Sequence, residues 1–149
     1  MNTAKTLSEK AATYFLGGYN CAESVLLTMY EYWNGENNLV PKIATSFGAG
    51  LGRCGSICGA LAGGVMAIGI KYGSNEPGKE NRLKPYELAQ RFYKQFEKQH
   101  GSVLCRKLIG YDLSDPEKLE QARKAEVFEK KCVDFVRTAV QNLVDLGEP

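Results

Sequence analysis

The sequence predicts an all-α protein, a single-domain bundle over residues 1–149 with about six or seven helices around a central helix rich in glycine and alanine. Three observations lead to this prediction. Apolar residues recur with a 3.6-residue period in several segments, and helix start and stop signals divide the chain into short blocks. The longest apolar stretch, residues 57–70, has 14 residues, whereas a membrane span needs about 20. We therefore expect a buried core helix there and no membrane span.

The first helices are bounded by glycine, asparagine and proline signals. Gly17 and Gly18 end the first helix. Asn20 is the expected N-cap of the second helix, and Glu23 completes a capping box with it. Pro41 fits the first position of a short third helix. These three helices are expected at residues 4–15, 21–33 and 41–46.

A fourth helix, residues 57–72, is expected at the centre of the bundle, with Ser56 as its N-cap. Glycine weakens a helix by about 1 kcal/mol relative to alanine. Its repeated use here makes sense if neighbouring helices must approach this one very closely. The small residues that cover one side of the helix are Gly59, Ala60, Gly63, Gly64 and Ala67.

The second half of the chain is also expected to be helical. Gly101 ends a long helix with an apolar stripe, and Ser102 can cap a short one. The segment around Pro116 is another start signal, because proline is favoured at the first helical position. The last helical stretch is expected to break once near Ala125. These helices are expected at residues 80–99, 102–108 and 116–146.

The charge balance excludes some classes of partner. The chain has 19 Lys and Arg and 17 Asp and Glu residues, with both signs scattered along it. This balance gives no reason to expect nucleic acid or an anionic membrane as a partner. The first residues lack the basic start and apolar core of a signal peptide, so we expect a cytoplasmic protein. His100, the single histidine, is expected at the exposed end of a helix as a C-terminal charge partner.

Five cysteines carry the chemical information. In a reducing cytosol, cysteines are core residues, metal ligands or reactive thiols. Cys21, Cys58 and Cys105 fall in the first turns of expected helices, where the helix dipole favours the thiolate. Cys132 lies on the apolar face of the last helix and is either a resolving partner or a core residue. Cys54 is expected in a loop, free to swing over Cys58. Any of these cysteines could instead be a small buried hydrophobe.

The loop before the fourth helix also matches the pattern G-x-G-x-x-G. A dinucleotide-binding fold would need a strand on each side of this loop, and the flanking segments do not fit strands. The loop amides could still hold an anion with the help of a basic side chain. The residues concerned are Gly50, Gly52, Arg53 and Gly55.

The string CGALAG, residues 58–63, reads C-G-A-x-x-G. It follows an N-C-A-E segment at residues 20–23 and precedes two separated cysteines. This pattern resembles the C-GCAxxG-C-C family, which is described as redox-active on account of its spaced cysteines. The resemblance implies redox activity, and family members with cytochrome-like neighbouring regions point to electron transfer. The family's four cysteines fall on Cys21, Cys58, Cys105 and Cys132, and Cys54 lies outside the pattern.

Three hypotheses follow for function. In the first, Cys58 is ionised and attacks a disulfide or oxidant, and Cys21 or Cys54 resolves the product; the partner is a redox protein or a small thiol or disulfide. In the second, four thiolates bind zinc or an iron–sulfur cluster. In the third, a non-enzymatic helical module binds a partner or forms a homodimer through its Gly/Ala-rich surface. The ligands in the second hypothesis are Cys21, Cys58, Cys105 and Cys132.

Overall fold

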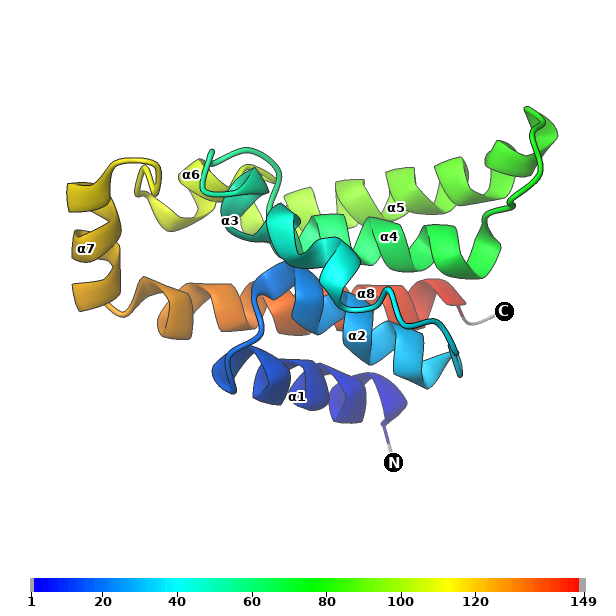
Figure 1. Cartoon of the computed structure of the whole chain (residues 1–149), viewed down its shortest axis with the longest axis horizontal. Helices are drawn as coiled ribbons and strands as arrows, with labels where there is room; N and C mark the ends of the chain where they lie inside the picture. The colour runs from blue at the N-terminus through cyan, green and yellow to red at the C-terminus, as the bar shows by residue number, and fades with distance from the viewer. Residues whose placement is uncertain (1, 148–149) are drawn as a thin grey trace.

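The computed structural model describes residues 2–147, and these form helices joined by turns, with no β-strand among them. The predicted all-α fold is confirmed. Figure 1 shows α4 and α5 above α2 and α8, α1 along the lower edge, and α6 and α7 at one end. The α-helices are α1 (Thr3–Leu16), α2 (Cys21–Tyr32), α3 (Gly48–Leu51), α4 (Gly59–Tyr72), α5 (Leu83–His100), α6 (Cys105–Ile109), α7 (Pro116–Lys124) and α8 (Val133–Gly147). Shorter turns are η1 (Lys42–Phe47) and η2 (Glu80–Arg82), both 3₁₀, and the π-helical turn η3 (Phe128–Cys132).

Helix α4 is packed on two sides by other helices, as its small residues predict. A Cβ atom on Gly63 would collide with the backbone of Ala22 in α2. One on Gly64 would collide with the ring of Phe92 in α5 and lie 3.2 Å from Leu143 in α8. The glycines therefore let α2, α5 and α8 approach the backbone of α4 closely. None of the described helices is long and apolar enough to cross a membrane.

The start of α2 is fixed by the expected capping box. The Asn20 side chain accepts a hydrogen bond from the Glu23 N–H (2.8 Å), and the Glu23 carboxylate accepts one from the Asn20 N–H (2.9 Å). The Asn20 amide also donates to the carbonyl of Thr45 (2.8 Å), whose hydroxyl donates to Glu23 (2.7 Å). These bonds tie η1 to α2 and place Cys21, the first residue of α2, in a defined position.

The expected caps of α4 and α6 were wrong. Helix α4 begins after Cys58, which is its N-cap in place of Ser56, and α6 begins at Cys105, three residues after Ser102. The reason is pairing between distant segments. The Cys58 N–H donates to the carbonyl of Val103 (2.8 Å), and the Cys105 N–H donates to the carbonyl of Ser56 (2.7 Å). Ile57 and Leu104, the two residues paired in this isolated antiparallel bridge, are extended, so neither segment can be helical there.

Other boundaries differ from the prediction by a few residues. Pro41 is the N-cap of η1 and not its first residue, and the helix expected from residue 80 begins as η2 before α5. The break at Ala125 is present, because Ala125 ends α7 and Glu126 has a positive φ of 55°. Cys132 consequently ends the π-helical turn η3 and does not lie well inside the last helix.

A left-handed turn precedes the C-G-A-x-x-G segment. Residues 49–53 all have positive φ angles, between 56° and 74°, and the Gly52 N–H donates to the Gly48 carbonyl (2.9 Å) to close the turn. The left-handed helix costs roughly 1–2 kcal/mol per L-residue, and Ala49, Leu51 and Arg53 bear this cost. Such strain persists only where surrounding structure imposes it, and it is concentrated at functional sites.

His100 is not the exposed charge partner that its position at the end of α5 predicted. Its ring packs between Phe96 and Phe135, with centroids 4.8 Å and 4.9 Å away. Its Nε2 atom is buried and has no hydrogen-bond partner within the described residues. Burial lowers the pKa of His100, and Asp134 opposes this effect in part.

The histidine gives a testable dependence of stability on pH. Because its pKa in the folded state lies below the ordinary value of 6.5, its neutral form stabilises the fold above that pH, and the stabilisation is lost as pH falls through the folded pKa. We expect His100→Phe to raise the free energy of unfolding by about 1 kcal/mol, because it removes an unsatisfied polar atom. Urea unfolding at pH 7.5 and 5.5 measures both effects. His100→Gln is a control whose side chain does not titrate, so it should reduce the dependence of the free energy of unfolding on pH without raising that free energy. A dependence on pH as steep as that of the wild type in His100→Phe would contradict the prediction.

Candidate cysteine site

Four of the five cysteines line one pocket, whose wall includes residues of α6 and α7. Figure 1 shows these two helices at one end of the bundle. The pocket has a volume of about 270 Å³. Its walls come from nearly every segment of the chain, so the site exists only in the folded protein. The lining residues are Phe15, Asn20, Cys21, Ala49, Arg53, Cys58, Gly59, Cys105, Leu108, Ile109, Leu113, Leu119, Arg123, Phe128, Cys132 and Phe135.

Each pocket cysteine lies at the start or end of a helical element. Cys21 is the first residue of α2, Cys58 is the N-cap of α4, and Cys105 is the first residue of α6. Cys132 is the last residue of η3. None of the cysteines forms a disulfide bond. The structure thus brings together the four cysteines singled out by the family resemblance.

The C-G-A-x-x-G motif has a packing explanation. A Cβ atom on Gly59 would collide with the Sγ atom of Cys21, and one on Gly63 would collide with the backbone of Ala22. The two glycines, one helical turn apart, therefore let the start of α2 cross the start of α4 in contact with it. The Cys21 thiol lies against the residue that follows Cys58 as a result.

Gly50 plays a similar part for Cys105. A Cβ atom on Gly50 would lie 2.7 Å from the Cβ of Cys105 and 2.7 Å from the backbone nitrogen of Ser56. Gly50 also has a φ of 71°, which L-residues rarely adopt. The glycine of the left-handed turn therefore allows α6 to bring its first residue to the pocket.

Burial controls the ionisation of the pocket thiols. Burial raises the pKa of Cys58 to about 12, although the N–H groups of Ala60 and Leu61 at the start of α4 act in the opposite direction. Burial raises the pKa of Cys105 to about 11, and it raises the pKa of Cys132 further still. The expectation that the helix terminus ionises Cys58 was therefore wrong. The dipole is present, but the loss of water outweighs it.

Cys21 has the most backbone N–H groups around its sulfur. Burial raises its pKa, and four N–H groups oppose that rise, the first being that of Ala49 in the left-handed turn and the others those of Ala22, Cys21 itself and Ala60. N–H groups from three segments therefore favour negative charge on this sulfur. If a thiolate forms in the pocket, the backbone N–H groups around Cys21 would stabilise it there better than at the other cysteines.

Cys54 is placed apart from the other cysteines. It is exposed and does not line the pocket, and its carbonyl accepts a hydrogen bond from the Arg106 guanidinium (3.2 Å). Of the loop residues expected to contact an anion, Arg53 lines the pocket, whereas Gly50, Gly52 and Gly55 do not. An anion at this loop and a resolving role for Cys54 remain predictions.

Several lining residues were not expected from the sequence. Arg123 of α7 and Phe15 at the end of α1 complete the wall, together with Phe128 and Phe135. The sequence pattern could have indicated Phe128 and Phe135, because residues 128, 132 and 135 share one face of the expected last helix. No sequence pattern indicated that Arg123 and Phe15 line the pocket, because their places there depend on how α1 and α7 pack.

The four thiols do not form a compact site for one ion. Within residues 2–147, no group of three Cys, His, Asp or Glu side chains could hold a metal ion. All four cysteines line the same pocket, and besides burial the nearby thiols of Cys21, Cys58 and Cys105 raise the pKa of Cys132.

Exposure predicts a wide spread of thiol reactivity in the cofactor-free protein. We expect one cysteine, the exposed Cys54, to react with Ellman's reagent at pH 8 about 100-fold faster than the other four, because only a thiolate reacts and burial raises their pKa values. Stopped-flow absorbance measures the phases. Cys54→Ser should remove the fast phase alone, and two or more fast thiols in the wild type would contradict the prediction.

Comparison with protein families gives a match over most of the chain. A family model described as "Putative redox-active protein (C_GCAxxG_C_C)" matches residues 19–146, a range that contains all four pocket cysteines. Comparison with curated proteins and with solved structures gave no match.

Proposed function

The chain belongs to the C_GCAxxG_C_C family of redox-active proteins, and from this we propose that its four-cysteine pocket is the redox centre and holds an iron–sulfur cluster for electron transfer. The observation that carries the proposal is the convergence of four cysteines on one pocket. The ligands would be Cys21, Cys58, Cys105 and Cys132.

The chemistry of the donor set supports a cluster. Four thiolates are the usual ligands of iron–sulfur clusters. A structural zinc site needs its four ligands on one ion, whereas no three of these side chains are grouped for a single ion. In a cluster, irons and sulfides occupy the space between the thiolates, so the four cysteines that line this pocket need not meet at a single ion. A bound cluster would supply one-electron chemistry.

The surroundings of the pocket also suit a negatively charged group. Helices α2 and α4, of 12 and 14 residues, both start at the pocket and present the positive ends of their dipoles to it. The Ala49 N–H faces Cys21, and Arg53 and Arg123 line the wall. None of the sixteen lining residues is acidic.

The raised pKa values favour a metal-bound function over a nucleophilic one. At neutral pH, burial keeps the pocket thiols protonated, and a protonated thiol is a poor nucleophile. Metal ions displace thiol protons, so iron would ionise these cysteines where the protein alone does not. Cluster loading should therefore release protons and weaken as pH falls. Five cysteines without a disulfide also fit a reducing compartment such as the cytoplasm.

The test is analysis of protein purified without oxygen. We expect iron and acid-labile sulfide in equal amounts, visible absorption that bleaches on reduction with dithionite, and an electron paramagnetic resonance signal in one redox state. Few thiols should be titratable before the cluster is removed. Zinc without sulfide, or five titratable thiols without iron, would overturn the cluster.

One observation favours a second candidate, a dithiol couple. The Cys21 sulfur lies against Gly59, next to Cys58, so these two cysteines are neighbours. In forming a disulfide bond they would lose two protons and two electrons, and a small disulfide or a redox partner protein would take these up and leave as two thiols. Iron-free protein whose thiol count falls by two on mild oxidation would support this couple, and an unchanged count would contradict it.

A further inference from the structure

The wall of the cysteine pocket holds apolar residues beside the four cysteines, with Phe15, Leu113, Leu119 and Phe128 among them. Resting on the proposed function, which assigns the four thiols to the redox centre, we infer that the apolar residues of this wall bind a small organic anion with an aromatic body, such as an aromatic carboxylate, beside that centre.

The unfilled volume is the first support. Protein interiors are close-packed and contain few voids larger than a water molecule, because atoms that line a void lose their contacts. A pocket of about 270 Å³ lined by phenylalanine and leucine is therefore a place for an apolar occupant. Iron and sulfide would bind at the thiols, and the apolar side chains of the wall would contact an aromatic body of one or two fused rings.

The charge of the wall is the second support. The charged residues that line the pocket are Arg53 of the left-handed turn and Arg123 of α7. Arg53 makes no ion pair within the described part of the chain, and Arg123 has only a long, solvent-exposed contact with Glu120 (3.8 Å), a type of pair that contributes little. Guanidinium groups bind carboxylates with two parallel hydrogen bonds. Both arginines are exposed, and the pocket wall holds no acidic residue, so the two guanidinium groups favour an anion.

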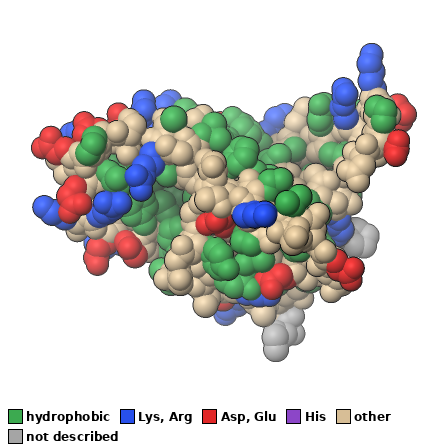
Figure 2. Space-filling view, viewed as in Figure 1, with side chains coloured by type: hydrophobic (Ala, Val, Ile, Leu, Met, Phe, Trp, Pro, Cys, Tyr) green, Lys and Arg blue, Asp and Glu red, His purple; other side chains and the backbone are tan. Residues whose placement is uncertain are grey.

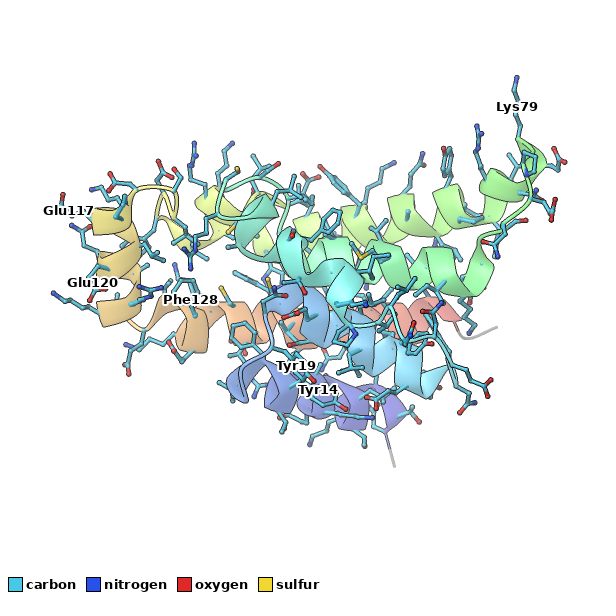
Figure 3. The ribbon with its side chains drawn as sticks, in the orientation of Figure 1. Tyr14, Tyr19, Lys79, Glu117, Glu120 and Phe128 are labelled. Atoms are coloured by element: carbon cyan, nitrogen blue, oxygen red, sulfur yellow. The ribbon has the colours of Figure 1, made fainter. Side chains whose placement is uncertain are left out.

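The arrangement of α7 is consistent with this selection. Figure 3 shows Glu117 and Glu120 on the side of α7 away from the bundle and Phe128 on the side towards it. In Figure 2, hydrophobic side chains are visible at this end of the molecule with Lys and Arg side chains beside them. Neither glutamate lines the pocket, and Glu120 reaches it only through its 3.8 Å contact with Arg123.

The experiment uses 2-naphthoate as the probe and the neutral alcohol 2-naphthalenemethanol as its control, with binding measured by anaerobic titration calorimetry. We expect wild-type protein to bind 2-naphthoate at least about tenfold more tightly than the alcohol, the difference that a charge-assisted hydrogen bond contributes. The double variant Arg53→Gln, Arg123→Gln should lose this preference. Leu119→Trp, which puts a larger side chain into the apolar wall of the pocket, should bind neither compound. The matched control Arg91→Gln changes an arginine on α5 that does not line the pocket and should bind as the wild type does.

Iron is measured in every sample, which separates this inference from the proposed cluster. Naphthoate binding by iron-free protein would support the anion site and contradict the proposed cluster. Equal affinity for naphthoate and the alcohol, or unchanged affinity in the double arginine variant, would overturn the anion site whatever the iron content. Loss of iron together with loss of naphthoate binding in the double variant would also overturn it, because the arginines would then serve the redox centre alone.

Discussion

Replacing Cys58 by serine is expected to reduce the iron bound per chain roughly tenfold or more, because second-shell losses alone cost that much in metal sites and this change removes a ligand. Cys58 is only 5 % exposed, at the N-cap of α4. Serine is among the preferred N-cap residues, so Cys58→Ser keeps the start of the helix. The variant therefore removes a thiolate ligand without removing the fold. Iron and sulfide analysis after anaerobic purification measures the loss, and circular dichroism checks the helix content.

The fifth cysteine provides the matched control. Cys54→Ser should retain wild-type iron, because Cys54 is exposed and does not line the pocket. Serine at Cys21, Cys105 or Cys132 should reduce iron as it does at Cys58. Full iron in Cys58→Ser, or its loss in Cys54→Ser, would show that the pocket is not the site.

The second large effect is on stability. Gly63→Ala is expected to lower the free energy of unfolding by about 2–4 kcal/mol, because the added methyl group collides with the backbone carbonyl of Ala22, which cannot move without displacing α2. The same change at Gly69 provides the control. A Cβ atom there meets nothing within 4 Å, so Gly69→Ala should stabilise the protein by about 0.5–1 kcal/mol through helix propensity.

Urea unfolding of the two variants and the wild type measures both effects under one condition. A difference of several kcal/mol between two glycine-to-alanine changes in the same helix can come only from tertiary contact, since their local helix propensities are the same. Equal stability of the two variants would mean that α2 does not approach α4 as described.

Local sequence signals predicted the elements, and tertiary contacts decided what they missed. The capping box at Asn20 and the break near Ala125 depend on neighbouring residues, and both are present. The cap of α4 was misplaced because Ser56 bonds to Cys105, a residue 49 positions away. A local sequence pattern therefore cannot predict that hydrogen bond.

In the candidate site too, local sequence patterns predicted some features and tertiary contacts decided the others. Motif spacing singled out the four cysteines, and the structure brings them to one pocket. The pKa values of Cys21, Cys58 and Cys105 were predicted to be lowered by the helix dipole, whereas burial raises them, because the dipole is a local property and burial is not. The pKa of Cys58 is set by how much water the surrounding helices exclude. For the same reason, the prediction that His100 is exposed was wrong, because Phe135 of α8 packs against its ring.

The distribution of the four cysteines along the chain sets an order of assembly. Cys21 lies near one end of the sequence and Cys132 near the other, so a nascent chain lacks the last of the four until most of it has been synthesised. Small zinc domains use their metal as a template for folding, but here the ligands meet only after the bundle has formed. A metal centre in this protein would be delivered to a finished fold, and its biogenesis would be a maturation step that follows folding.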